Sequence, residues 1–119
     1  MSKIQDAVVE LHGLPGVKGA AVITHDGLMV AASLDEEFTP DVIGGLTSYL
    51  LMTTQRSLRE GGLGRASQYL LTATHGKTII VDIEESSLVV LLDQFAELAA
   101  TRREVQDAAQ RIRRASRIA

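Results

Sequence analysis

Residues 16–33 place the strongest constraint on the fold of this 119-residue chain. The stretch GVKGAAVITHDGLMVAAS joins two runs of small and branched apolar residues at Asp26-Gly27. An Asp-Gly pair favours a tight hairpin turn, because both central residues of such a turn need positive φ. Residues 28–32 contain no polar side chain, so this strand has no face suited to water. We therefore expect a β-hairpin that is covered on both faces.

Three segments have the apolar spacing of helices. The first begins at Ser2, a capping residue, and ends before Gly13. The second runs from Pro40 to Glu60, since Thr39 and Pro40 favour a helix start and glycines follow Glu60. The third begins near Asp93. Its apolar positions repeat at helical spacing and comprise Phe95, Leu98, Val105, Ala108, Ala109 and Ile112.

Three further β-rich runs predict a meander. Residues 66–74 and 77–83 are separated by a turn at His75-Gly76, and residues 88–92 (LVVLL) again lack a polar face. With the hairpin, this predicts an α+β fold with a five-stranded antiparallel sheet in a three-layer sandwich. The helix over 40–60 would cover one face, and the other two helices would cover the opposite face. We expect one domain over residues 1–119.

The helix predicted over 40–60 carries more apolar residues than one sheet can cover. One stripe comprises Val42, Leu46, Tyr49, Leu50, Thr53 and Ser57. A second comprises Ile43, Thr47, Leu51, Thr54 and Leu58. Gly44, Gly45 and Ser48 are small enough to admit another backbone, which would explain two glycines inside a helix. The alternative is that the extra apolar residues lie under neighbouring loops.

Composition and motifs exclude several functions. The chain has no cysteine, 3% aromatic residues and a formal net charge of -3, which disfavour thiolate metal sites and nucleic acid as a partner. No spacing typical of a metal site, a nucleophile or a phosphate loop occurs, and His25-Asp26 is better explained by its turn. We expect no catalytic, cofactor-binding or metal-binding residue. Since no apolar run approaches the roughly 20 residues of a membrane span, we also expect no membrane insertion and a cytoplasmic location.

Two groups of arginines leave alternatives open. Six of the arginines lie in residues 102–119. Four of them are near the helix end, where positive charge complements the helix dipole or meets an acidic partner surface or an anionic membrane; they are Arg111, Arg113, Arg114 and Arg117. Arg56, Arg59 and Arg65 cluster around the end of the second predicted helix. An arginine offered to another protein's phosphate site is a known means of accelerating GTP hydrolysis.

Four segments together resemble the roadblock, or dynein light chain, family, which includes bacterial MglB-type regulators of Ras-like GTPases. They are GVKGAAVITHDGLMVAAS at 16–33, QYLLTATHGKTIIVDI at 68–83, SLVVLLD at 87–93 and AELAATRREVQDAAQRI at 96–112. The resemblance covers nearly the whole chain and implies a profilin-like sandwich.

The resemblance also implies a homodimer, or a heterodimer with a paralogue. The third strands would pair across a two-fold axis, and the second helices would pack side by side. The interface residues that this implies are Ile43, Leu51, Leu58, Gln68, Tyr69, Leu70, Leu71 and Thr72. Helical phase suggests a GTPase-facing side of the second helix with Ser48, Met52, Gln55, Arg56 and Arg59.

The leading functional hypothesis is a non-enzymatic, dimeric regulator or scaffold that binds a small Ras-like GTPase and stimulates its hydrolysis of GTP. The alternative is a structural adaptor light chain of a motor or signalling complex that activates no GTPase. A third hypothesis is a small-ligand sensor. Low aromatic content and the lack of convergent polar residues argue against it.

Overall fold

A five-stranded antiparallel sheet forms the middle layer of the computed structural model, which describes residues 2–118, with side chains from 2 to 116. Its strands lie in the order β2-β1-β5-β4-β3, so that β2 and β3 are the edges. The strands are β1 (Val17–Thr24), β2 (Met29–Leu34), β3 (Gln68–Ala73), β4 (Gly76–Asp82) and β5 (Ser86–Asp93). Every neighbouring pair is antiparallel. The two ends of the predicted domain, Met1 and Ala119, lie outside the described residues.

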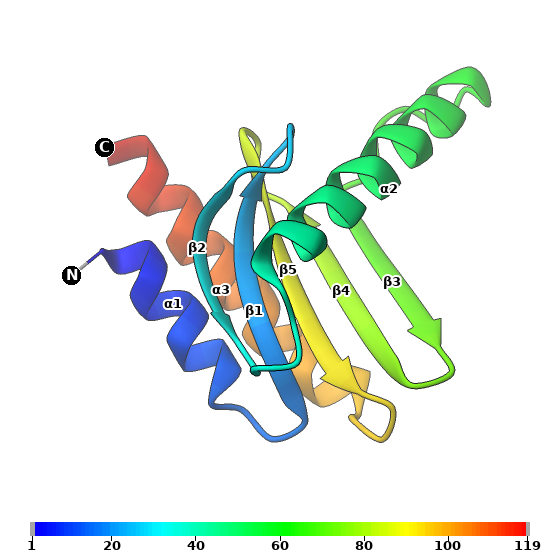
Figure 1. Ribbon diagram of the computed structural model, residues 1–119. Helices are drawn as coiled ribbons and strands as arrows, with labels where there is room; N and C mark the ends of the chain where they lie inside the picture. The colour runs from blue at the N-terminus through cyan, green and yellow to red at the C-terminus, as the bar shows by residue number, and fades with distance from the viewer. Residues whose placement is uncertain (1, 119) are drawn as a thin grey trace.

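Three helices complete the sandwich. They are α1 (Lys3–His12), α2 (Pro40–Glu60) and α3 (Leu98–Ile118). Figure 1 shows α2 on one face of the sheet and α1 with α3 on the other, as the sequence predicts. The predicted cap of α1 is confirmed, because the Ser2 hydroxyl accepts a hydrogen bond from the Ile4 amide at 3.1 Å.

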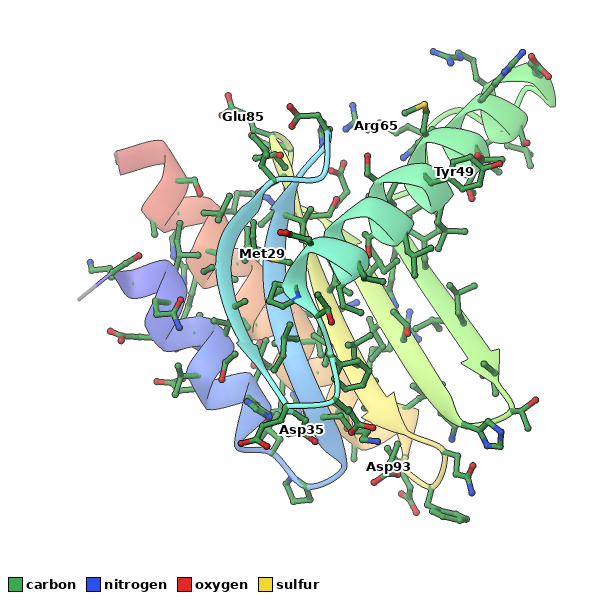
Figure 2. All side chains as sticks on the ribbon, viewed as in Figure 1. Met29, Asp35, Tyr49, Arg65, Glu85 and Asp93 are labelled. Atoms are coloured by element: carbon green, nitrogen blue, oxygen red, sulfur yellow. The ribbon has the colours of Figure 1, made fainter. Side chains whose placement is uncertain are left out.

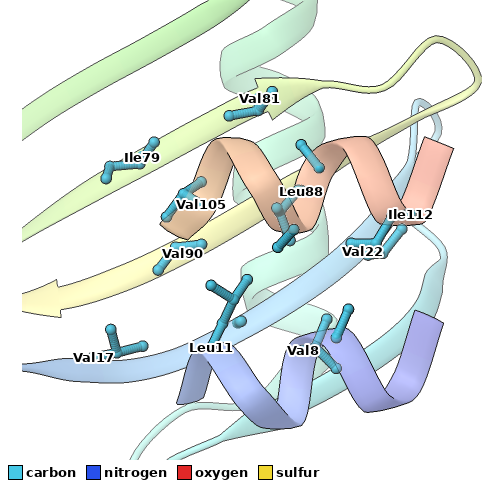
Figure 3. Packing of buried hydrophobic residues seen from close by; sticks show 14 of the residues in the cluster. Val8, Leu11, Val17, Val22, Ile79, Val81, Leu88, Val90, Val105 and Ile112 are labelled. Atoms are coloured by element: carbon cyan, nitrogen blue, oxygen red, sulfur yellow. The ribbon is translucent and has the colours of Figure 1, made fainter. Parts of the chain in front are cut away.

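The larger core lies between the sheet and the pair α1–α3 (Figure 3). Val8 of α1, Val105 and Ile112 of α3, and Leu88 and Val90 of β5 are each at most 1% exposed. A smaller cluster fills the space under α2, and it takes Val89 from the opposite side of β5. The run LVVLL is therefore a central strand buried on both faces, which confirms the prediction for residues 88–92.

The prediction for residues 28–32 holds in part, because Ala31 lies in the core on the α1 side and Met29 and Ala32 pack against the cluster under α2, whereas Leu28 and Val30 are exposed. Val30 is 50% exposed and forms a bulge, since Val22 pairs with Ala31 while Ile23 pairs with Met29. The connection is also longer than a two-residue turn: residues 25–28 lie between β1 and β2, and only Gly27 among them has positive φ, at 93°. The bulge breaks the alternation of faces, so Val30 is exposed although both faces of β2 contact a helix layer.

Two smaller predictions also need correction. Helix α3 begins at Leu98, and Phe95 lies in the preceding turn with 83% of its surface exposed, so it is not a core residue. The β3–β4 turn consists of Thr74 and His75, because Ala73 already pairs with Gly76. In both places the predicted helix or turn is present, but its boundary lies one to a few residues from the predicted position.

Candidate functional site

Helix α2 presents an apolar strip to solvent. Val42, Leu46 and Tyr49 are 54%, 65% and 71% exposed. We call these three residues the outward strip, from which Tyr49 projects in Figure 2. They lie within one side of the helix at 100° per residue. Because side chains of this size are rarely clustered in the open on a helix, the outward strip is a candidate docking surface.

The opposite side of α2 packs on the chain itself. A Cβ atom on Gly44 would lie 2.5 Å from the carbonyl oxygen of Gly27, so glycine is needed for this approach. The Ser48 hydroxyl donates a hydrogen bond of 2.8 Å to the carbonyl oxygen of His25. The close backbone approach that small residues predict is therefore made by the chain's own β1–β2 connection. Gly45 faces open space.

This packing sets the rotation of α2 and corrects part of the predicted dimer surface. Leu51 is only 9% exposed and packs with Tyr69 of β3, which is 8% exposed. Both side chains belong to the chain's own core. Ile43 and Leu58 are half-buried, and Ile43 also packs against this cluster.

The predicted edge strand is confirmed, since β3 pairs only with β4 and its other side is unpaired by any described strand. Leu70 and Leu71 are 45% and 40% exposed, and Thr72 is exposed as well. Gln68 is half-buried and accepts a hydrogen bond from the Gln106 side chain at 2.9 Å. A free edge with exposed leucines is a template for pairing with another strand.

The predicted GTPase-facing residues divide into two groups. Met52, Arg56 and Arg59 are exposed, and Arg56 forms an ion pair of 3.5 Å with Glu60. Ser48 is buried and holds the β1–β2 connection. Gln55 is half-buried, and its amide group donates to the carbonyl of Ala66 at 3.2 Å and accepts from its N–H at 3.1 Å. Ser48 and Gln55 are therefore structural residues, which corrects their predicted exposure.

The sequence contained a signal for the correct rotation of α2. Both apolar stripes are equally suited to a core, so hydrophobicity alone cannot choose between them. Gly44, Ser48, Leu51 and Gln55 follow one another at intervals of four, three and four residues. Gly44 and Ser48 are the small residues at which backbone comes close, and the spacing of the four residues marks the side toward the sheet. The outward strip is then the side opposite to it.

A pocket of about 310 Å³ opens between the C-terminal half of α2 and the sheet. Its lining comes from six parts of the fold and comprises His25, Leu51, Met52, Gln55, Arg65, Tyr69, Asp82 and Ser87. Arg65 Nη2 lies 3.2 Å from Asp82 Oδ2, and His25 Nε2 lies 3.8 Å from Asp82 Oδ1. Figure 2 shows Arg65 beside the β1–β2 connection and α2. The expectation that polar residues do not converge is therefore wrong at this place.

Two features distinguish the electrostatics of this pocket. Burial raises the pKa of Tyr69, and the negative charge of Asp82 raises it further, so the phenol remains a hydrogen-bond donor. Asp26, which follows His25 in the sequence, accepts a hydrogen bond from the Thr24 hydroxyl. That bond lowers the pKa of Asp26. His25 thus faces Asp82 and not the adjacent carboxylate.

Two other kinds of site are absent from the described part of the chain. No group of three or more histidine, cysteine, aspartate or glutamate side chains between residues 2 and 116 is arranged to hold a metal ion. Among the helices of residues 2–118, none has the length and apolarity that a membrane span requires.

The chain matches a known protein family and a curated relative over most of its length. The family model of the Roadblock/LC7 domain matches residues 3–93. A curated relative, the uncharacterized protein MJ1340 of Methanocaldococcus jannaschii, is 33% identical over 110 residues, which are 92% of this chain and 96% of the relative.

Solved structures share the fold at low sequence identity. MglB of Myxococcus xanthus has a TM-score of 0.93 at 12% identity, covering 100% of this chain and 98% of that one. An MglB described with a tetrameric arrangement has a TM-score of 0.84 at 18% identity, covering 95% and 87% of the two chains. Profilin II of Acanthamoeba castellanii has a TM-score of 0.63 at 16% identity, covering 93% and 94%. The last likeness bears out the predicted profilin-like sandwich.

Proposed function

Because the chain belongs to the Roadblock/LC7 family, we propose that it is a dimeric, non-enzymatic regulator that binds a small Ras-like GTPase. Members of this family are generally non-catalytic regulators, which supports a GTPase-regulating or adaptor role. The single observation that carries the proposal is that the chain leaves two surfaces uncovered, the outward strip of α2 and the free edge of β3.

The proposed occupant of the outward strip is a second copy of this chain. Leu46 lies on the side of α2 that carries Ile43 and Leu50, whose half-buried side chains extend the strip toward the sheet, and Tyr49 continues the strip away from them. Pairing of β3 with β3 of the second copy would satisfy the free backbone groups of the edge at which Leu70 and Leu71 are exposed. An MglB of the same fold is described in a tetrameric arrangement, which supports assembly of copies.

The GTPase would meet the other flank of α2. Met52 and Arg59 are nine and sixteen residues after Ile43, so at 100° per residue they lie on the opposite side of the helix from Ile43. Arg56 lies between that flank and the outward strip. A flank with two exposed arginines fits the acidic and phosphate-bearing surroundings of a nucleotide site. We propose these three residues, without Ser48 and Gln55, as the contact surface.

The test is a binding assay with a Ras-like GTPase of the same organism, loaded with GDP or with a GTP analogue. We expect binding that differs between the two nucleotide states, and no GTP hydrolysis by the chain alone. Reversing the charge at Arg56 and Arg59 should abolish binding, whereas the matched change Arg103→Glu on α3 should not. Arg103 is exposed on the opposite face of the sandwich.

The adaptor hypothesis gives a different result in the same assay. If the GDP and GTP forms bind equally and turnover of GTP does not change, the chain is a passive adaptor. If neither form binds, the GTPase role is contradicted. Measuring turnover together with binding separates regulation of the GTPase from simple attachment to it.

A further inference from the structure

A groove at the start of α3 combines apolar side chains with negative charge. It lies between the α1–β1 connection and the first turns of α3, and we call it the acidic groove. Its lining includes Leu14, Pro15, Phe95, Glu97, Ala100 and Glu104. We propose that the acidic groove binds a segment of a partner protein in which an arginine stands between large apolar residues. This partner is additional to those proposed for α2 and β3, and its binding does not depend on them.

Contacts within the chain hold the floor of the acidic groove. At Gly16, whose φ is 80°, an added Cβ atom would lie 3.0 Å from the Cβ atom of Ala96, so the two connections that form the floor are in close contact. The Asp93 N–H donates to the carbonyl oxygen of Gly16 at 2.9 Å, and Lys77 Nζ donates to that of Ala96 at 2.8 Å. Because the floor is already ordered, binding has few further groups to immobilise. The volume of about 460 Å³ is within the range of specific ligand sites, about 300–1,000 Å³.

The ring of Phe95 is the largest apolar group of the lining. Phe95 is 83% exposed, and its N–H donates to Asp93 Oδ1 at 2.8 Å, so a hydrogen-bonded turn holds the ring in the open. Pro15 and Ala100 are exposed and Leu14 is half-buried, so a ligand can also reach the rest of the apolar lining. An aromatic ring and three aliphatic side chains in one groove form an apolar surface that the chain leaves uncovered. Large apolar residues of a partner would cover it.

The charge of the acidic groove is negative. Asp93, Glu97 and Glu104 belong to its lining, which contains no basic side chain. Glu97 and Glu104 are exposed, and within residues 2–116 their carboxylates make no hydrogen bond or ion pair. Arg102 and Arg103 of the same helix lie at least about 100° around its axis from both glutamates. The groove therefore complements a positively charged side chain.

Arginine is the side chain that matches both features of the groove. A guanidinium group binds carboxylates through paired hydrogen bonds and also stacks on aromatic rings, which the ammonium group of lysine does not do. Glu97 and Glu104 flank Ala100 on one side of α3, at three and four residues from it. A guanidinium group placed over Ala100 would thus have a carboxylate on each side. Apolar neighbours of that arginine would pack on Leu14 and Phe95.

The proposal is tested with three peptides that are acetylated and amidated at their ends. Gly-Leu-Arg-Leu-Gly has both features, Gly-Leu-Gln-Leu-Gly lacks the charge, and Gly-Gly-Arg-Gly-Gly lacks the apolar side chains. The readout is the ring resonances of the full chain isotope-labelled at phenylalanine. The chain has two phenylalanines, so Phe95 reports on the groove and Phe38, which does not line it, is the internal reference. We expect the first peptide to shift Phe95 selectively, to bind more tightly than either other peptide, and to bind less tightly as salt is added.

A double variant tests the two carboxylates. Glu97→Gln with Glu104→Gln should weaken binding of the first peptide about two- to thirtyfold, the range for two exposed ion pairs. The matched control is Asp6→Asn with Glu85→Gln, which changes the net charge equally at exposed positions outside the acidic groove and should leave the affinity unchanged. Figure 2 shows Glu85 and Asp93 at opposite ends of the sheet. Thermal unfolding verifies that both double variants are folded.

Each other outcome overturns the proposal. Equal binding of the glutamine peptide shows an apolar groove without recognition of charge, and equal binding of the glycine-flanked arginine peptide shows attraction to surface charge alone. An unshifted Phe95, or equal affinity of the first peptide for the two double variants, shows that the groove is not the binding site. A Phe95 resonance that moves when the chain alone is diluted shows that a second copy occupies the groove. No GTPase is present in these samples, so their result is independent of the proposed regulatory role.

Discussion

Gly44 and Gly45 are neighbours in α2 but have opposite surroundings. A Cβ atom at position 44 would clash with the Gly27 carbonyl oxygen, whereas one at position 45 would meet nothing within 4 Å. Replacing either glycine by alanine gives the same gain in helix propensity, about 1 kcal/mol. The difference between the two variants therefore reports the clash alone.

We expect Gly45→Ala to raise the free energy of unfolding. The free energy of unfolding of Gly44→Ala should be lower than that of Gly45→Ala by about 1–3 kcal/mol, the usual cost of overpacking. Urea unfolding of the two variants measures this difference. Equal stability of the two variants would show that the β1–β2 connection moves away from α2 at no cost, and the contact would then not set the rotation of the helix.

Tyr69 makes stability depend on pH in the alkaline range. Because its pKa is raised in the folded chain, mainly by burial, the folded state holds the phenolic proton at pH values where the unfolded state has lost it. The free energy of unfolding should therefore be unaffected by Tyr69 below about pH 10, the ordinary pKa of tyrosine, and should fall as pH rises above that value.

We expect Tyr69→Phe to remove this part of the alkaline loss, and Tyr49→Phe to retain it. The pKa of Lys18 is also raised, chiefly by its hydrogen bond to Glu37, and it adds a loss in the same direction. That loss is common to all three proteins, so it cancels in the comparison. Urea unfolding from about pH 8 to about pH 11 measures the effect. Parallel curves for the unaltered chain and Tyr69→Phe would contradict it.

The strands and helices differ in how far their surroundings could be predicted from sequence. Strand β5 was predicted correctly because a run without polar residues is compatible with burial on both faces. The same argument holds only in part for β2, whose Ala31 and Ala32 pack on opposite faces, because the bulge at Val30 leaves that side chain exposed. A bulge depends on pairing with β1, so it has no signature in the strand's own residues.

The rotation of α2 could not be predicted from hydrophobicity, since two apolar stripes compete for one sheet. Tertiary contact with the β1–β2 connection decides between them. The pocket could not be predicted either, because His25, Arg65, Tyr69 and Asp82 are distant in the chain and none belongs to a recognisable motif. Edge strand β3 was predicted through the family resemblance, and its topology is confirmed.

The outward strip of α2 leads to a prediction about self-association. Leu46→Lys should convert a dimer into single copies, because a lysine without a partner in an apolar interface costs about 3 kcal/mol or more, which corresponds to at least about a hundredfold weaker association. Val9→Lys is the matched control, since Val9 is an exposed apolar residue of α1 on the opposite face. Light scattering over a dilution series measures the mass of each variant.

Single copies of the unaltered chain throughout the dilution series would contradict the proposed dimer. Equal dissociation of Leu46→Lys and Val9→Lys would show that the strip is not the interface. Retained folding of Leu46→Lys is expected, because Leu46 is 65% exposed in the single chain and makes little contribution to its core.

The two outer layers of the sandwich differ in how much of their surface contacts the rest of the chain. On the side of α1 and α3, Arg111 contacts Glu10 at 2.8 Å, and Arg113 donates to the carbonyl oxygen of Asp82 at 3.0 Å. At least two of the C-terminal arginines therefore make contacts within the chain, in addition to their place near a helix end. On the other side, α2 leaves its outward strip uncovered. The proposed second copy and the proposed GTPase are accordingly placed on the α2 side.

The proposal of one domain over residues 1–119 is tested by removing α3. The family match ends at residue 93, before this helix, yet α3 supplies a large part of the main core. Val105 and Ile112 are 0% and 1% exposed, so a chain ending at residue 97 would leave the α1 side of the sheet open to water. We expect that chain to lose cooperative unfolding, because the apolar surface it exposes opposes a stable native state.

A point variant keeps this test interpretable if the truncated chain aggregates. Ile112→Ala should lower the free energy of unfolding by about 2–5 kcal/mol, the range for truncating a buried isoleucine, whereas Arg102→Ala on the exposed side of α3 should change it by at most about 0.5 kcal/mol. If Ile112→Ala were as stable as Arg102→Ala, or if the truncated chain unfolded as cooperatively as the full one, α3 would be an appendage to a domain that ends near residue 93. The sandwich would then have only two complete layers, and the face of the sheet that α3 covers would be another surface available to a partner.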